Sequence, residues 1–337
     1  MIMGDSMNLS KSRYTLGIRC KKNLWLACNK KEEAIESGND SILETGNKVG
    51  ELARHLFGDD YILIDYDDNK EKLQQTKKYM EEKPNIICEA SFNYDDNFCS
   101  IDILKNDIDG VEIYEVKSST DIKDIYIDDV SYQTWVLKKC GLNVKRSYLV
   151  YVNSNYVKNG DLNINEYFNI EDVTSILDDN VEEKVNELKE IMNSKEEPNI
   201  DLSMDCKKSK KVPYDCPFFN YCTQSLPKPN VFDIGWNTRF SKKLEMYYQD
   251  KISFVDILTS GGVNPKADLQ MSTELYNLEP RINKEVIEEL LDSFTYPLYF
   301  LDFESYQAAI PTIDGTKPYQ QICFQYSLHY IDRKSVV

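Results

Sequence analysis

Three acids and one lysine, Glu89, Asp102, Glu115 and Lys117, are the side chains best suited to chemistry in this sequence. Carboxylates that cluster repel one another unless a cation neutralises them, so three acids at one point would favour a bound divalent ion. Their oxygen ligands point to Mg²⁺ or Mn²⁺. Such an ion polarises a phosphate oxygen and makes hydroxide from bound water, which would suit phosphodiester hydrolysis.

Two hairpins would have to bring these residues together. If each hairpin is centred on its turn, Glu89, Asp102 and Glu115 lie side by side on neighbouring strands, with Cβ atoms about 5 Å apart. The pattern of β-branched and aromatic residues between turn residues is typical of an antiparallel meander. The expected strands are 86–92, 98–104 and 111–117, and the turns are 94–97 and 106–110.

Each residue of this group has an expected role. Asp102 and Glu115 would hold the metal together with the backbone carbonyl of Val116, and Glu89 would support them. Side chains alternate along a strand, so Lys117 shares the face of Glu115, where it would orient the attacking water. The alternative is an acidic sheet face with unrelated cross-strand pairs.

Helices on either side of these strands predict a mixed α/β (α+β) fold with a central sheet. The apolar period over 42–57 indicates an amphipathic helix, and its Gly46 and Gly50 would let another backbone approach closely. Further helices are expected at 127–140, which carries Gln133, and at 171–194, a charged segment.

Asp102, the word Glu115-Val-Lys117 and Gln133 resemble the D…ExK…Q order of RecB-like PD-(D/E)XK nucleases. The segments GNKVGELAR, SIDIL, YEVKSST and YQTWVLKKCG are similar to a bacterial family of uncharacterised proteins related to the CRISPR-adaptation nuclease. This resemblance covers roughly residues 9–222. It implies a restriction-endonuclease-like core that hydrolyses DNA, in which Gln133 contacts the metal ligands or the DNA backbone.

Two positions depart from the nuclease pattern. Gly50 stands where the CRISPR enzyme carries a metal-binding histidine, and Leu137 stands where RecB-like enzymes often place a tyrosine. These departures motivate a second hypothesis, a nucleic-acid-binding module with a weakened catalytic centre.

Four of the nine cysteines form a candidate cofactor site. Cys206, Cys216 and Cys222, with the word PYDCPFFNYC, resemble the C-terminal cysteine triplet of iron–sulfur nucleases, which makes Cys20 the fourth ligand of a structural [4Fe-4S] cluster. A zinc Cys₄ site, in a protein that need not bind nucleic acid, and four unligated buried thiols are the alternatives. No ligand role is expected for Cys28, Cys88, Cys99, Cys140 and Cys323.

The net charge of −17 is unusual for a DNA enzyme, because phosphate contacts need Lys and Arg. Two basic runs, at 11–31 and at Lys207, Lys208, Lys210 and Lys211, flank the cysteines and favour DNA as a partner. The resemblance suggests DNA that is single-stranded or has free ends. No apolar run is long enough for a membrane span and no signal peptide is evident, so a cytoplasmic protein is expected.

A further motif, Asp302-Phe-Glu304, follows an apolar run as in the first motif of DEDD exonucleases with an RNase H-like fold. The segment AAIPTIDGTKPYQQICFQYSLH resembles the second domain of the same uncharacterised family. The residues that follow are too few for an independent core, so a truncated domain without activity is expected. The expected divisions are 9–223 for the nuclease-like domain, 224–296 for a linker and helical segment, and 297–337 for the exonuclease-like fragment.

Overall fold

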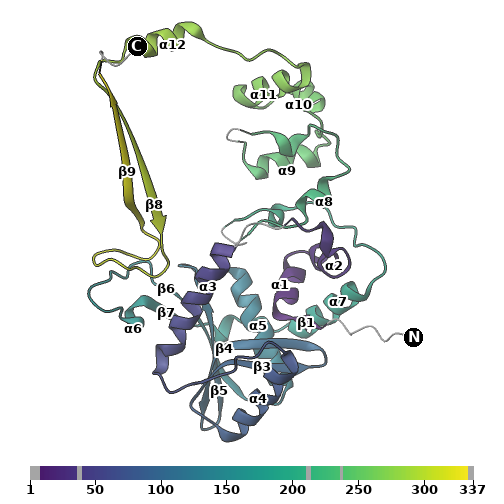
Figure 1. Cartoon of the computed structure of the whole chain (residues 1–337). Coiled ribbons are helices and arrows are strands. Elements are labelled where there is room, and N and C mark those ends of the chain that lie inside the picture. The colour runs from purple at the N-terminus through teal and green to yellow at the C-terminus, as the bar shows by residue number, and fades with distance from the viewer. Residues whose placement is uncertain (1–7, 36–39, 210–213, 236–237, 333–337) are drawn as a thin grey trace. The chain divides into compact units, whose positions relative to one another are not determined.

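The computed structural model describes residues 8–35, 40–209, 214–235 and 238–332. The chain divides into two compact units (Figure 1). The first unit consists of Met1–Cys222 with Ala308–Tyr319, and the second of Thr223–Gln307 with Gln320–Val337.

The first unit contains a mixed sheet flanked by helices, so the predicted α/β class is confirmed. Among the described residues the sheet has seven strands: six run in the order β2-β3-β4-β5-β6-β7, and the seventh, β1, pairs with β4 beside this path. The pairs β3–β4, β4–β5 and β6–β7 are antiparallel, whereas β2–β3, β5–β6 and β1–β4 are parallel. The strands are β1 (Leu9–Ser10), β2 (Ile62–Leu63), β3 (Ile86–Tyr94), β4 (Asn97–Asp107), β5 (Gly110–Lys117), β6 (Val144–Val152) and β7 (Phe168–Asp172).

The three central strands form the predicted meander in the predicted register. Cys88 pairs with Ile103 and Ala90 with Ile101, which leaves Glu89 opposite Asp102. The β4–β5 ladder ends with Ile103 opposite Tyr114. The next residue on β4 is Asp102 and the next on β5 is Glu115, so the same register places these two opposite each other. Symmetric hairpin turns are therefore a correct description of both connections.

The alternation of side chains shifts at the carboxylates. Cys88 and Ile103 pack in the core cluster on one face of the sheet, yet Ala90 and Ile101 pack in the cluster on the other face. Residues two apart on a regular strand would share a face. Glu89 has a left-handed backbone, with φ of 60°, which accounts for the shift on its strand.

Helices cover both faces of the sheet. α1, α5 and α7 pack on one face through a large apolar cluster, and α3 and α6 pack on the other. Figure 1 shows α1, α2 and α7 gathered beside one another. The helices are α1 (Lys11–Arg19), α2 (Lys21–Asn29), α3 (Asp40–Ala53), α4 (Asn69–Glu82), α5 (Asp124–Lys139), α6 (Ile164–Tyr167), α7 (Val181–Asn193) and α8 (Phe219–Thr223).

The predicted helix 171–194 is wrong at its beginning. Glu171 and Asp172 belong to β7, which pairs with β6, and the helix begins only at Val181. Charged residues are compatible with β7 because most of its side chains are exposed to solvent.

Ala308–Tyr319 is an integral part of the first unit. Lys158 exchanges backbone hydrogen bonds with this segment, donating to Thr316 at 3.0 Å and accepting from Gly315 at 2.8 Å. Ala309 is buried in the core cluster that contains α3, and the Tyr319 hydroxyl donates to the carbonyl of Ser118. The segment thus packs next to the end of β5.

The second unit has a small helical core and a long hairpin. Val231, Ile234, Phe254, Ile257 and Met271 are among its buried residues. Nowhere in the described ranges does a helix combine the length and apolar character needed to cross a membrane. The elements are α9 (Phe240–Tyr248), α10 (Phe254–Ser260), α11 (Pro265–Tyr276), α12 (Lys284–Asp292), β8 (Leu298–Gln307) and β9 (Gln321–Ile331).

Candidate active site

Asp102 lies where β5 parts from β4. Its Oδ2 accepts a hydrogen bond of 2.7 Å from the backbone N–H of Val116, just beyond the last ladder pair. A buried backbone N–H needs a partner, so the carboxylate replaces the ladder bond that the split removes. The second oxygen, Oδ1, remains directed to the site and lies 4.0 Å from Lys11 Nζ.

Glu115 is the centre of the site, with only 2% of the residue exposed. Its carboxylate accepts from Lys117 Nζ at 2.5 Å and from Gln133 Nε2 at 2.7 Å. Lys11 Nζ also donates to both carboxylate oxygens, at 3.0 and 3.1 Å. The structure thus brings the predicted Glu115, Lys117 and Gln133 into direct contact.

Two residues of the site were not predicted for it, Asp129 on α5 and Lys11 at the start of α1. Asp129 Oδ2 accepts from Lys117 Nζ at 2.6 Å, and its Oδ1 accepts from Gln133 Nε2 at 3.0 Å. Asp129 and Gln133 are four residues apart and therefore share a helix face. That spacing is a signal from which Asp129 could have been inferred, whereas nothing local connects Lys11 with Glu115.

The carboxylate–lysine cluster comprises Asp102, Glu115, Asp129, Lys11 and Lys117. Burial and the nearby Glu115 raise the pKa of Asp102 to about 7, although Lys11 opposes the change. Burial also disfavours the charged form of Glu115, but Lys11 and Lys117 outweigh it and hold the pKa of Glu115 well below its usual range. Three carboxylates face two ammonium groups, and Asp102 carries the uncompensated charge.

Asp129 and Lys117 are shifted by the same balance. Burial raises the pKa of Asp129, and the Glu115 carboxylate adds to this effect. Burial lowers the pKa of Lys117, but the Asp129 and Glu115 carboxylates outweigh it and raise the pKa above its usual value. Lys117 is therefore a charged donor rather than a general base.

An open pocket of about 790 Å³ borders the cluster. Glu89 lines it and lies 3.6 Å from Arg54 in an ion pair. Gly46 and Gly50 of α3 line it too, and a Cβ added to either would meet no atom of the described residues within 4 Å. The expectation that these glycines admit another backbone is therefore wrong, because they face open space in the pocket.

The residues present suit a divalent ion only in part. Asp102 and Glu115 supply adjacent carboxylates, and Val116 lines the same pocket. Within residues 8–35, 40–209, 214–235 and 238–332, no three Asp, Glu, His or Cys side chains converge on one ion position. The Lys11 ammonium group contacts both Glu115 oxygens, so an ion held by Glu115 would have to displace it.

The four predicted cofactor cysteines line a single small pocket between α2 and the segment before α8. Cys20 is the residue that precedes α2, and its side chain makes no capping hydrogen bond. Cys216 donates its backbone N–H to the Cys206 carbonyl at 3.0 Å, which brings these two neighbours together. Cys222 lies on α8 and lines the same pocket.

Burial raises the pKa of the Cys216 and Cys222 thiols to about 11, so a metal would have to displace their protons. Arg19 opposes this change at Cys216, and Lys22 opposes it at Cys222. The chemistry of the donor set, four thiols beside two basic residues, fits a metal–thiolate group, but among the described residues no three of these thiols converge on a single ion position. The free space is about 20 Å³, so the side chains would have to move apart around a four-iron core.

Lys207 and Lys208 of the second basic run lie beside these cysteines, whereas Lys210 and Lys211 are outside the described residues. Lys207 pairs with Asp215 at 3.2 Å. Part of the basic run therefore serves local ion pairing.

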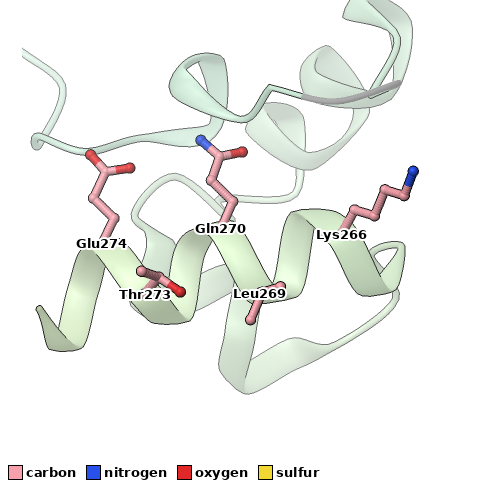
Figure 2. A pocket seen from close by; sticks show the side chains of 5 residues that line it. All are labelled: Lys266, Leu269, Gln270, Thr273 and Glu274. Carbon is pink, nitrogen blue, oxygen red and sulfur yellow. The ribbon is translucent and has the colours of Figure 1, made fainter. Parts of the chain in front are cut away.

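Asp302 and Glu304 are two residues apart on β8 and are both exposed. The second unit has a pocket of about 560 Å³. The five described residues that line it all project from α11, as Figure 2 shows. One of them, Gln270, bonds to the backbone of Asp233 and Gly235 and has a structural role.

A comparison with family models matches the C-terminal end of the chain. Residues 299–337 match the family described as "Domain of unknown function (DUF2779)". None of the curated proteins matches the chain. The matched residues include Asp302 and Glu304 but none of the residues of the carboxylate–lysine cluster.

Proposed function

We propose that the first unit is a metal-dependent nuclease that hydrolyses phosphodiester bonds in DNA. The observation that supports this most is the buried Glu115 carboxylate, which meets Lys117, Lys11 and Gln133 beside Asp102 at the wall of an open pocket. Buried acids with opposed pKa shifts in a cleft are typical of functional sites, because a fold gains no stability from crowding like charges.

In this proposal Asp102, Glu115 and the Val116 carbonyl hold Mg²⁺ or Mn²⁺. The ion supplies Lewis-acid polarisation of a phosphate oxygen and a lowered pKa for bound water. Asp129 would restrain the Lys117 ammonium group, which would orient the water and stabilise the negative charge on the non-bridging phosphoryl oxygens. Gln133 restrains the Glu115 carboxylate.

The pocket also presents cations that would contact a DNA phosphate. Lys11, Lys117 and Arg54 line it together, and each is able to donate to phosphate oxygens. Single-stranded DNA or DNA with free ends is the substrate that the family resemblance favours. We further propose a cytoplasmic location, where the nine unpaired cysteines would stay reduced.

The four cysteines hold a structural [4Fe-4S] cluster in this proposal. Such a cluster would join the start of α2 to the loop that carries Cys206 and Cys216, and it would stabilise the fold by closing a long stretch of chain. Zinc would also join these segments, but a zinc protein is colourless and an iron–sulfur protein is brown.

The second candidate function is a nucleic-acid-binding module with a weakened catalytic centre. Two observations favour it: Gly50 offers no side chain to the pocket, and the Lys11 ammonium group already neutralises Glu115. Such a module would bind DNA through the same cations without cutting it.

A nuclease assay on labelled single-stranded and duplex DNA with Mn²⁺ tests the proposal. Lys117→Ala should reduce cleavage on the order of 10²-fold or more, the range for a lost positioned catalytic group. Lys105→Ala is the matched control, because Lys105 is a half-buried lysine of β4 that pairs with Glu112 at 3.5 Å. If wild type and Lys117→Ala both leave the DNA intact, the enzyme is refuted, and DNA binding without cleavage would support the second candidate. Equal, measurable cleavage by both proteins would refute the role of Lys117.

A further inference from the structure

Two side chains beside the four cysteines bury polar atoms that have no hydrogen-bond partner among the described residues. Asn23 is 1% exposed, and neither its Nδ2 nor its Oδ1 makes a hydrogen bond to any described residue. Arg19 is 9% exposed, and its Nη1 is likewise unpaired. Buried polar groups are nearly always hydrogen-bonded, so the donors Asn23 Nδ2 and Arg19 Nη1 call for acceptors, and Asn23 Oδ1 calls for a donor.

Both residues line the cysteine pocket. Arg19 is fixed there because its Nε donates to the Asp205 carbonyl at 2.7 Å and its guanidinium group lies 5.0 Å from the centre of the Tyr214 ring. Asn23 is three residues after Cys20, on the first turn of α2. A side chain at this position of a helix often accepts a hydrogen bond from the N–H of the N-cap residue. Asn23 does not do so, because the N–H of the N-cap residue Cys20 donates to the Leu16 carbonyl at 2.9 Å.

Other groups around the pocket already favour negatively charged sulfur. The backbone N–H of Ser203 donates to Cys206 Sγ at 3.4 Å, and the N–H of Phe218 donates to the Cys216 thiol. The beginning of α2 adds the positive end of a helix dipole at Cys20.

We propose that Asn23 Nδ2 and Arg19 Nη1 donate hydrogen bonds to the sulfur atoms of an iron–sulfur group. The group would be held by Cys20, Cys206, Cys216 and Cys222. Sulfur in such a group accepts hydrogen bonds and carries negative charge, so the amide presents its NH₂ rather than its oxygen. The inference rests on the cysteine part of the proposed function and does not depend on nuclease activity.

Hydrogen bonds to the sulfur atoms stabilise the reduced, more negative state of a cluster and raise its reduction potential. They also orient the ligands, and loss of such supporting contacts typically weakens metal binding on the order of 10-fold or more. Asn23 and Arg19 are thus positioning residues that set the potential and the retention of iron.

An ordinary buried water is the competing occupant. The space of about 20 Å³ would hold one, and Asn23 and Arg19 would give it polar partners. The two explanations differ in what happens when the amide is removed, because a water-filled pocket would leave the cluster unaffected.

The test compares iron-loaded, anaerobically purified full-length protein with Asn23→Leu, a substitution of similar size that removes the donor. Asn29→Leu is the matched control, since Asn29 is on the same helix but donates to the Trp25 carbonyl at 2.9 Å. Midpoint potential is measured by redox titration, and iron loss is followed by absorbance in the presence of a chelator. Arg19→Lys keeps the charge but loses Nη1 together with the Nε bond to the Asp205 carbonyl, and it is measured as a second variant beside Asn23→Leu.

Asn23→Leu and Arg19→Lys should each shift the midpoint potential to more negative values and accelerate iron loss by about 10-fold, whereas Asn29→Leu should match wild type. Asn23→Leu should also raise the melting temperature of the metal-free protein, because it removes an unpaired buried amide, while it lowers that of the iron-loaded protein. If the protein takes up iron but neither substitution changes its midpoint potential or its rate of iron loss, the inference about Asn23 and Arg19 is refuted while the cluster proposal stands. A protein that takes up no iron refutes the cluster proposal as well.

Discussion

Lowering the pH from 8 to 5.5 should weaken Mn²⁺ binding at the carboxylate–lysine cluster, because Asp102 must ionise to hold a cation. Burial and the Glu115 carboxylate raise the pKa of Asp102 to about 7, against the opposing effect of Lys11. An ordinary aspartate, with a pKa of about 3.9, would be fully ionised over the whole range. A pH dependence between 5.5 and 7 would therefore identify the shifted carboxyl group.

The size of the effect follows from the shift. About three pKa units separate Asp102 from a solvated aspartate, and each unit corresponds to about 1.4 kcal/mol, so ionisation costs up to about 4 kcal/mol. This is an upper bound, since the side chain keeps 25% of its exposure. Because the ion replaces a proton, the apparent affinity should fall by about tenfold for each pH unit below 7.

In the absence of metal, Asp102 should make the protein less stable as pH rises, whereas most carboxyl groups of folded proteins make it more stable. Between about pH 4 and pH 7 the folded chain holds more protons at Asp102 than the unfolded chain, so the free energy of unfolding decreases as pH rises. The pKa of Asp129 is shifted in the same direction. Glu115 has a lowered pKa, so its stabilising effect is lost only in more acid solution, below about 4.3.

Thermal unfolding at several pH values, with and without Mn²⁺, measures both effects. Asp102→Asn is the control, because the amide keeps an oxygen that can accept from the Val116 N–H at the strand split. Mn²⁺ should stabilise wild type at pH 8 far more than at pH 5.5, and should leave Asp102→Asn unchanged. A Mn²⁺ effect of equal size at both pH values, or one retained by Asp102→Asn, would refute the reasoning.

Three further predictions concern the surroundings of the site. Asp129→Asn should lower the rate of DNA cleavage by about 10- to 100-fold with little change in DNA affinity, because Lys117 loses its 2.6 Å partner; steady-state kinetics that show an unchanged turnover would contradict this. Gly50→His should tighten Mn²⁺ binding in a calorimetric titration, because a side chain at that position meets open space, and weaker binding would show that the imidazole does not reach the ion. Tyr319→Phe should lower the free energy of unfolding of the first unit by about 0.5–1.5 kcal/mol in urea titration, since it removes the bond to the Ser118 carbonyl; an unchanged midpoint would show that this contact is not formed in solution.

The meander and its register could be predicted from the sequence because local rules determine them. Turn residues mark the centres of both hairpins, and a hairpin centred on its turn fixes which residues face each other. Asp102 and Glu115 follow from that geometry alone. Gln133 followed from its helix and from the family resemblance, and its contact with Glu115 is now visible.

The rest of the site depends on contacts between distant segments. Lys11 meets Glu115 only because α1 packs on the sheet face that bears the site, and no spacing rule connects residues 104 positions apart. Glu89 has a positive φ that few non-glycine residues adopt, so regular alternation could not reveal the change of face at this point. The place of Ala308–Tyr319 in the first unit likewise results from tertiary packing.

Charge balance connects the metal to the substrate. With all groups ionised, the carboxylate–lysine cluster carries three carboxylates and two ammonium groups, and its net negative charge would repel a phosphodiester. A divalent ion reverses the sign of the cluster, so that one phosphodiester charge then neutralises it. The ion would also free Lys11 from Glu115, which makes that ammonium group available to the phosphate. In a protein of net charge −17, metal would therefore be needed for DNA to enter this pocket as well as for hydrolysis.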